Sequence, residues 1–159
     1  MADKYTLSVL VENHFGVLAR VSNLISARGF NIDSFTVSTT EDPTISRMTI
    51  VVDADPVKIE QVKNQLNRLI DVIEVQELKE GQYLDRELLL ARVSADGAAR
   101  SAVEAIAARF GAKLADANGR SVVIEATGDT TALNQLVEQL RPHGITKLVR
   151  TGRIALEKS

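Results

Sequence analysis

The chain has 159 residues, of which 45% are apolar and 25% charged, and its formal net charge at pH 7 is -2. Such a length suits one ordinary domain or two small ones, and the slight acidity provides no overall positive field for nucleic acid or an anionic membrane. Cysteine is absent, which excludes disulfides and thiolate metal sites. We find no signal-peptide core and no apolar span of roughly 20 residues, so we expect a cytoplasmic protein.

The first half of the sequence predicts the element order βαββαβ. YTLSVLVE is rich in apolar and β-branched residues, which predicts a strand. The apolar residues from Val17 to Ile25 recur at helical spacing, and Gly29 follows as a residue suited to a left-handed cap. The turn residues EDPT separate two alternating runs, with a bulge expected after Ile32. Asp55 predicts the cap of a second helix. We expect strands at 5–12, 30–40, 46–53 and 71–78, and helices at 16–28 and 56–69.

The second half repeats this pattern. RELLLARVSA favours a strand, GAARSAVEAIAARFGA a helix that ends at Gly111, and KLADANGRSVVIEA two strands around an Asn118-Gly119 hairpin turn. Asp129 predicts the cap of a further helix, and ITKLVRTG a last strand. The polar segment 78–86 shows neither the helical nor the strand periodicity of apolar residues, so it is the expected link between the two copies.

Each βαββαβ unit predicts a four-stranded antiparallel sheet with both helices on one face, the ferredoxin-like arrangement. The fold class is therefore α+β, with two tandem ferredoxin-like domains at residues 1–80 and 81–159. The opposite sheet face would stay uncovered although its residues are far from polar throughout. We therefore expect another copy of the chain, or a partner protein, to cover this face or a strand edge.

Three motifs occur in order in the first half: ENxxGVLAR, RGFNI and SRMTIVV, with QLNRLIDVIEV behind them. Together they resemble the ACT domain of the regulatory (small) subunit of acetolactate synthase, also called acetohydroxyacid synthase. The resemblance covers essentially the whole chain, because that family also carries a second ferredoxin-like domain. It identifies residues 1–80 as an ACT domain.

The resemblance implies a regulatory subunit that is not an enzyme by itself. It would activate a separate catalytic subunit of acetolactate synthase and confer feedback inhibition by valine in branched-chain amino-acid synthesis. Thiamine diphosphate, Mg and FAD would belong to the catalytic partner, with no cofactor in this chain. The family also implies a homodimer, or a higher oligomer, formed through the ACT domains. Nucleic acid and membrane are not expected partners.

The loop before the first helix has the chemistry to bind an amino acid. A helix that starts near Gly16 leaves its first N–H groups without intrahelical partners, so the amides around Gly16, Val17 and Leu18 can receive a carboxylate. Asn13 offers donors and an acceptor to a zwitterion. Val17, Leu18 and Ile32 are expected to form an apolar wall for a small aliphatic side chain.

The resemblance assigns a role to Asn31 as well. In that family the effector lies between two ACT domains, with the helix-start loop of one chain facing the second strand of its neighbour. Asn31 stands at the beginning of that strand. The second copy has SADGAAR in place of ENHFGVL and Lys113 in place of Asn31, so we expect no equivalent site there. Phe15 can narrow the pocket, which leaves valine, leucine and isoleucine open as effectors.

A purely structural alternative makes Gly16 a turn glycine, Asn13 a helix cap and Asn31 part of an Asx turn. His14 and His143 have no partner at metal-ligand spacing, so no metal site is expected. An acylphosphatase-like enzyme would need an Arg in a phosphate loop, whereas Arg20 falls inside the helix. An RNA binder would need stacking aromatics, which are only 4% of the residues. A DNA-binding sensor would need adjacent helices, and strands separate both pairs.

Overall fold

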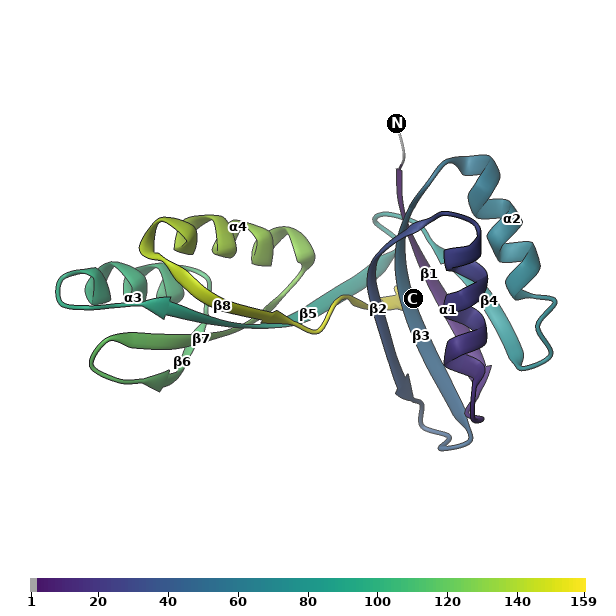
Figure 1. Cartoon of the computed structure of the whole chain (residues 1–159), viewed down its shortest axis with the longest axis horizontal. Helices are drawn as coiled ribbons and strands as arrows, with labels where there is room; N and C mark the ends of the chain where they lie inside the picture. The colour runs from purple at the N-terminus through teal and green to yellow at the C-terminus, as the bar shows by residue number, and fades with distance from the viewer. Residues whose placement is uncertain (1–2) are drawn as a thin grey trace. The chain divides into compact units, whose positions relative to one another are not determined.

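The computed structural model describes residues 3–159 and shows two compact units (Figure 1). The first unit comprises the chain up to Leu84 together with Arg153–Ser159, and the second comprises Asp85–Gly152. Each unit contains one βαββαβ motif with an antiparallel sheet. The predicted α+β class with tandem ferredoxin-like domains is confirmed.

The first unit has the sheet order β2-β3-β1-β4, so that β1 and β2, the two strands joined by α1, lie on either side of β3. All its strand pairs are antiparallel. Its elements are β1 (Asp3–Glu12), α1 (Val17–Ala27), β2 (Asn31–Thr39), β3 (Ile45–Ala54), α2 (Pro56–Leu66) and β4 (Val72–Leu78).

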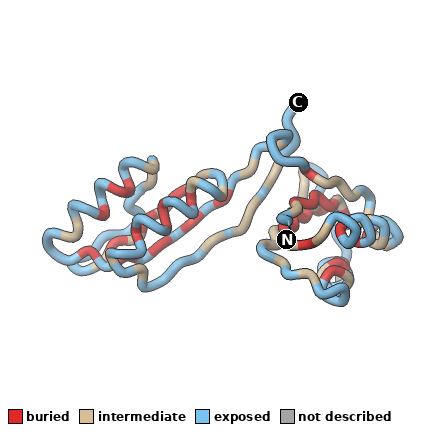
Figure 2. Tube along the Cα trace, turned by 90° about the horizontal axis from the view of Figure 1, so that it is seen from above, coloured by how far each residue is buried: buried red, intermediate tan, exposed pale blue. Residues whose placement is uncertain are grey.

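Alternation along the strands determines the core of the first unit. Leu7 pairs with Ile50 and Val9 with Met48, so these side chains share the sheet face that α1 and α2 cover. Each fully buried aliphatic side chain contributes about 1.5–3 kcal/mol. The helices add to the same cluster Val17, Val21, Ile25, Ile59, Val62 and Leu66. In Figure 2 the buried positions along the chain are coloured red.

The second unit has the sheet order β6-β7-β5-β8, with α3 and α4 over one face (Figure 1). Its core gathers Leu89, Ile124 and Leu136, each fully buried. The elements that follow β4 are β5 (Tyr83–Ser94), α3 (Ala99–Arg109), β6 (Lys113–Ala117), β7 (Ser121–Gly128), α4 (Thr130–Leu140), the 3-10 turn η1 (Arg141–His143), β8 (Ile145–Arg150) and β9 (Ile154–Glu157).

The helix caps and the β-bulge lie where the sequence predicts them. The Asp55 side chain accepts a hydrogen bond from the Lys58 N–H at 2.9 Å, and Asp129 caps α4 in the same way through the Ala132 N–H at 2.7 Å. The β2 register shifts between Ile32 and Ser34, which confirms the predicted bulge. Gly29 lies beyond the end of α1 with φ 75°, a conformation that favours glycine.

The sequence prediction missed β9 and made the link between the copies too long. The predicted link 78–86 shrinks to the turn between Leu78 and Tyr83, because Tyr83–Arg86 belongs to the long strand β5. β9 pairs with β5, and the Lys158 N–H donates to the Gln82 carbonyl at 2.9 Å. The expected division into 1–80 and 81–159 therefore differs from the observed units at residues 81–84 and at Arg153–Ser159, both of which belong to the first unit.

The returning segment also corrects the expectation of an uncovered sheet face. Thr6 alternates with Leu7 and points away from the helices, yet it is only 3% exposed. Arg153 Nη1 donates to Thr6 Oγ1 at 2.9 Å and to the Tyr83 hydroxyl at 3.2 Å. The chain itself thus covers part of the helix-free face of the first unit.

None of the helices within residues 3–159 has the length and apolar character needed to span a membrane.

Candidate functional site

The loop between β1 and α1 presents free backbone amides. Gly16 is the N-cap residue with φ 84°, and the first helical hydrogen bond runs from the Arg20 N–H to the Gly16 carbonyl at 3.1 Å. Within residues 3–159, the Gly16 and Leu18 N–H groups have no hydrogen-bond partner, and no side chain caps the helix. The start of α1 therefore has unsatisfied donors and the positive end of a helix dipole, which together suit an anion.

Asn13 is anchored to the turn between β2 and β3. Its N–H donates to the Thr44 carbonyl at 2.8 Å, and its side-chain Nδ2 donates to the Pro43 carbonyl at 3.1 Å. Asp42 shapes this turn, because its carboxylate accepts from the Thr44 hydroxyl at 2.7 Å and from the Thr44 N–H at 2.9 Å. These two hydrogen bonds, the hydroxyl first, lower the pKa of Asp42. The turn holds Asn13 and leaves its amide oxygen available.

Arg20 is a residue of this loop region that the sequence prediction passed over. It lies one helical turn after Gly16, and a Cβ placed on Gly16 would lie 3.6 Å from Arg20 Nη1. The guanidinium pairs with the Asp71 carboxylate, while remaining 52% exposed. It therefore brings a positive charge beside the free amides. The i, i+4 spacing from Gly16 was the signal available in the sequence.

The predicted apolar wall is divided between the core and the surface. Val17 is 3% exposed and belongs to the core, and Ile32 is half-buried against the same core. Leu18 is 46% exposed beside the loop, and Phe15 is fully exposed. The apolar surface that this chain presents near Gly16 is therefore formed by Leu18 and Phe15.

Asn31 lies at the other end of the sheet from this loop. It pairs with Asp53 of β3, which in turn pairs with Lys4, whereas Asn13 follows the far end of β1. At about 3.3 Å per residue, the strand between these positions spans roughly 30 Å. Asn31 is exposed, and its Nδ2 donates to Asp33 Oδ1 at 3.3 Å. One chain therefore does not bring Asn31 together with Asn13 and Gly16.

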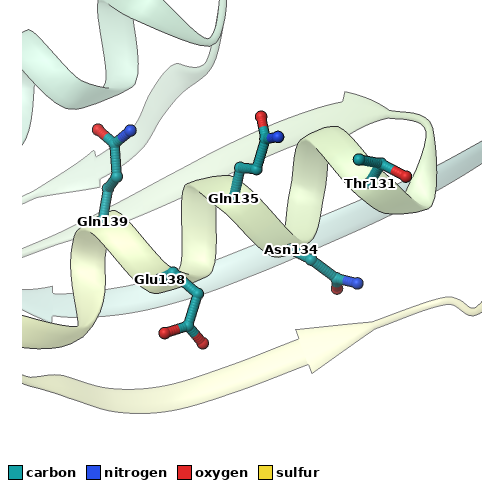
Figure 3. A pocket seen from close by; sticks show the side chains of 5 residues that line it. All are labelled: Thr131, Asn134, Gln135, Glu138 and Gln139. Carbon is teal, nitrogen blue, oxygen red and sulfur yellow. The ribbon is translucent and has the colours of Figure 1, made fainter.

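The second unit has no Asn in the loop that corresponds to residues 13–16. Gly97, with φ 57°, precedes α3, but its neighbours are Asp96 and Ala98, and β6 begins at Lys113. The hollow drawn in Figure 3 lies along α4 of this unit. All its lining side chains come from that one helix and are polar, namely Thr131, Asn134, Gln135, Glu138 and Gln139. Glu138 is the one charged side chain among them, so the hollow offers no converging charges.

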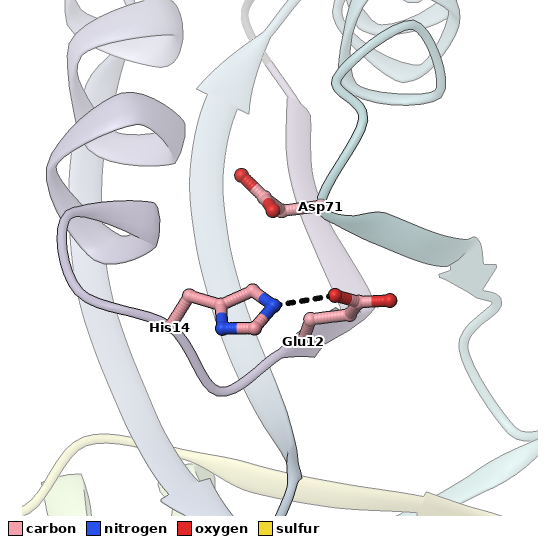
Figure 4. A group of neighbouring side chains, drawn as sticks. All are labelled: Glu12, His14 and Asp71. Atoms are coloured by element: carbon pink, nitrogen blue, oxygen red, sulfur yellow. Dashed lines mark hydrogen bonds and ion pairs between the residues drawn. The ribbon is translucent and has the colours of Figure 1, made fainter.

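A further cluster lies beside the helix-start loop of the first unit. Glu12, His14 and Asp71 place a ligand atom each within 4.8 Å of one another (Figure 4). This arrangement is of the kind that can hold a metal ion, which the sequence prediction did not expect. Asp71 escaped notice because it reaches the loop only through the pairing of β1 with β4.

Comparison with known proteins covers both units. Residues 7–74 match the model of the AHAS small subunit-like ACT domain, and residues 86–159 match that of the small subunit of acetolactate synthase. The probable acetolactate synthase small subunit of Archaeoglobus fulgidus is 46% identical over 153 residues, which cover 96% of each chain. The acetolactate synthase small subunit of Mycobacterium leprae is 46% identical over 97% of this chain and 91% of the relative.

A solved structure agrees with this sequence similarity. The crystal structure of the acetolactate synthase small subunit from Thermotoga maritima superposes with a TM-score of 0.90 at 30% identity, covering 99% of this chain and 98% of the other. The similarity spans both βαββαβ units, the loop at Gly16 and the C-terminal segment. The chain belongs to the acetolactate synthase small-subunit family.

Proposed function

We propose that this chain is the regulatory subunit of acetolactate synthase, that it activates the thiamine-diphosphate-dependent catalytic subunit, and that it confers feedback inhibition by valine. The relatives are named small subunits of this enzyme, which implies a catalytic partner. Thiamine diphosphate, Mg and FAD would be bound by that partner. The cytoplasmic location expected from the sequence stays a prediction.

The observation that carries the proposal is the set of free amides at the start of α1. The carboxylate of valine would accept from the Gly16 and Leu18 N–H groups, and the exposed Arg20 guanidinium would add a favourable charge. The Asn13 oxygen would accept from the ammonium group. Leu18 and Phe15 supply the nearest exposed apolar surface for the isopropyl group, and leucine or isoleucine would use the same contacts.

The site would be completed by the ACT domain of a second copy. Asn31 is too far from Gly16 to meet the same ligand within one chain. Asn31 is exposed, and Gly16 is partly exposed. If a neighbouring chain brings its Asn31 to the Asn13 loop, one effector can form hydrogen bonds with the side-chain amides of both residues. Valine would then bind only the assembled dimer and would shift its conformational equilibrium, typically by 1–3 kcal/mol of coupling.

Reconstitution tests the proposed function directly. The chain would be mixed with a cognate acetolactate synthase catalytic subunit, and acetolactate formation from pyruvate would be measured with and without valine. We expect the chain alone to be inactive, the mixture to be more active than the catalytic subunit alone, and valine to remove the gain. A catalytic subunit whose rate and valine response do not change on mixing would contradict the proposal.

Asn31→Ala tests the contribution of the second chain. We expect the valine concentration for half-inhibition to rise at least tenfold, because the variant loses the amide that reaches the ligand from the neighbour. Its stability should be unchanged, since within residues 3–159 the Asn31 side chain makes only an exposed hydrogen bond to Asp33. Asn64→Ala, an exposed amide on α2, is the matched control. Unchanged inhibition in Asn31→Ala, or binding of valine by a monomeric parent, would contradict the shared site.

A further inference from the structure

Three metal-ligating side chains from separate segments of the first unit converge beside the Asn13–Gly16 loop. Glu12 ends β1, His14 lies in the following loop, and Asp71 immediately precedes β4. The backbone fixes their approach, because the Glu12 N–H donates to the Asp71 carbonyl at 2.8 Å and the His14 N–H donates to the Glu12 carbonyl at 2.9 Å. The cluster is thus held by main-chain pairing.

The donor set is mixed, with one imidazole nitrogen and carboxylates from two residues. Mg²⁺ and Ca²⁺ prefer all-oxygen sites, whereas Zn²⁺ and its first-row neighbours combine imidazole with carboxylate. Three protein ligands leave a fourth position for water or another molecule. The chemistry of the cluster therefore favours a divalent transition ion over the hard cations.

The side chains are close to the required geometry. His14 Nε2 and Glu12 Oε2 are 2.6 Å apart and share a hydrogen bond (Figure 4). Two ligands at about 2.0–2.2 Å from one tetrahedral zinc ion lie about 3.3–3.6 Å apart. The two side chains would therefore have to separate by about 1 Å to admit the ion in place of their hydrogen bond. Both side chains are at least half exposed and free to make this movement.

Asp71 is oriented for this role by Arg20. The Asp71 side chain is only 14% exposed, and its Oδ2 accepts from the Arg20 guanidinium, which leaves Oδ1 for an ion. Carboxylate ligands in metal sites commonly have such a hydrogen-bonded outer partner. With a neutral imidazole, the two carboxylates and the one guanidinium give a local charge of -1, which attracts a cation.

We propose that Glu12, His14 and Asp71 form a binding site for a divalent first-row transition ion, with Zn²⁺ as its preferred probe. The ion would bridge the end of β1, the helix-start loop and the start of β4. It would thereby hold the segment on either side of Asn13. The proposal needs no assumption about valine, because metal binding is measured on the chain alone.

Zinc titration of the full-length, tag-free chain tests the site. After treatment with a chelator and its removal, ZnCl2 would be titrated by isothermal calorimetry, and bound zinc would be counted after equilibrium dialysis. We expect about one Zn²⁺ per chain. His14→Gln and Glu12→Gln should each weaken binding by at least the roughly tenfold loss that altered outer-shell groups produce. Millimolar Mg²⁺ should compete poorly.

The chain contains a matched control in its only other histidine, His143, which lies in η1 of the second unit. His143→Gln should bind Zn²⁺ as the parent does. Because residues 12 and 14 are exposed, the variants should fold, and circular dichroism would verify this. The site is excluded if the parent binds no zinc, if folded His14→Gln and Glu12→Gln bind as tightly as the parent, or if His143→Gln loses binding equally.

Discussion

Gly16→Asp should leave the reconstituted enzyme activated but indifferent to valine. The new carboxylate would stand where we place the carboxylate of the effector, take up the free amides at the start of α1 and repel the ligand. We expect the valine concentration for half-inhibition to rise more than tenfold, with most of the activation retained. Asn13→Ala should act in the same direction, because it removes the oxygen proposed to bind the ammonium group.

The backbone of Gly16 requires a control for strain. Its φ of 84° disfavours any side chain, at a cost of about 1–2 kcal/mol. Gly97→Asp is matched to it, since Gly97 has φ 57°, also precedes a helix and has nothing within 4 Å of an added Cβ. Gly97→Asp should keep valine inhibition. Acetolactate formation would be measured for both variants over a series of valine concentrations. If the Gly16→Asp enzyme is inhibited at the same valine concentration as the parent, the site is misplaced.

Leu136→Ala should destabilise the second unit by about 2–5 kcal/mol. Leu136 of α4 is fully buried in the core between the helices and the sheet, so the truncation removes apolar contacts and leaves a cavity. Leu148→Ala removes the same atoms from a residue of β8 that is 40% exposed, so it should lower the free energy of unfolding much less.

Urea denaturation followed by circular dichroism would measure both losses of stability. Hydrogen exchange read by mass spectrometry would assign the loss to residues 85–152, because amides of the first unit should keep their protection. Equal effects of Leu136→Ala and Leu148→Ala would contradict the assigned core. If Leu136→Ala speeds hydrogen exchange in the first unit as much as in the second, the two units do not have independent cores.

The secondary-structure elements and their repetition are readable from the sequence. Periodicity located the helices and strands, and the capping residues Asp55 and Asp129 and the hairpin turn at Asn118 stand where predicted. These signals are local, because a helix stripe, a cap or a turn depends on residues a few positions apart. The free amides at the start of α1 were also predictable, since they follow from the position of one glycine, whereas the role of Asn13 and Gly16 in binding an effector stays a prediction.

Which side chains meet in space depends on the folded arrangement of the strands and helices. It buried Val17, set Asn31 at the opposite end of the sheet from Gly16, and brought Arg153 back to Thr6. It also brought Asp71 beside Glu12 and His14. Each of these outcomes depends on strand pairing between segments distant in sequence, and the register of such pairs leaves no local pattern. The physical reason is that alternation fixes the face on which a side chain lies but not its neighbours across the sheet.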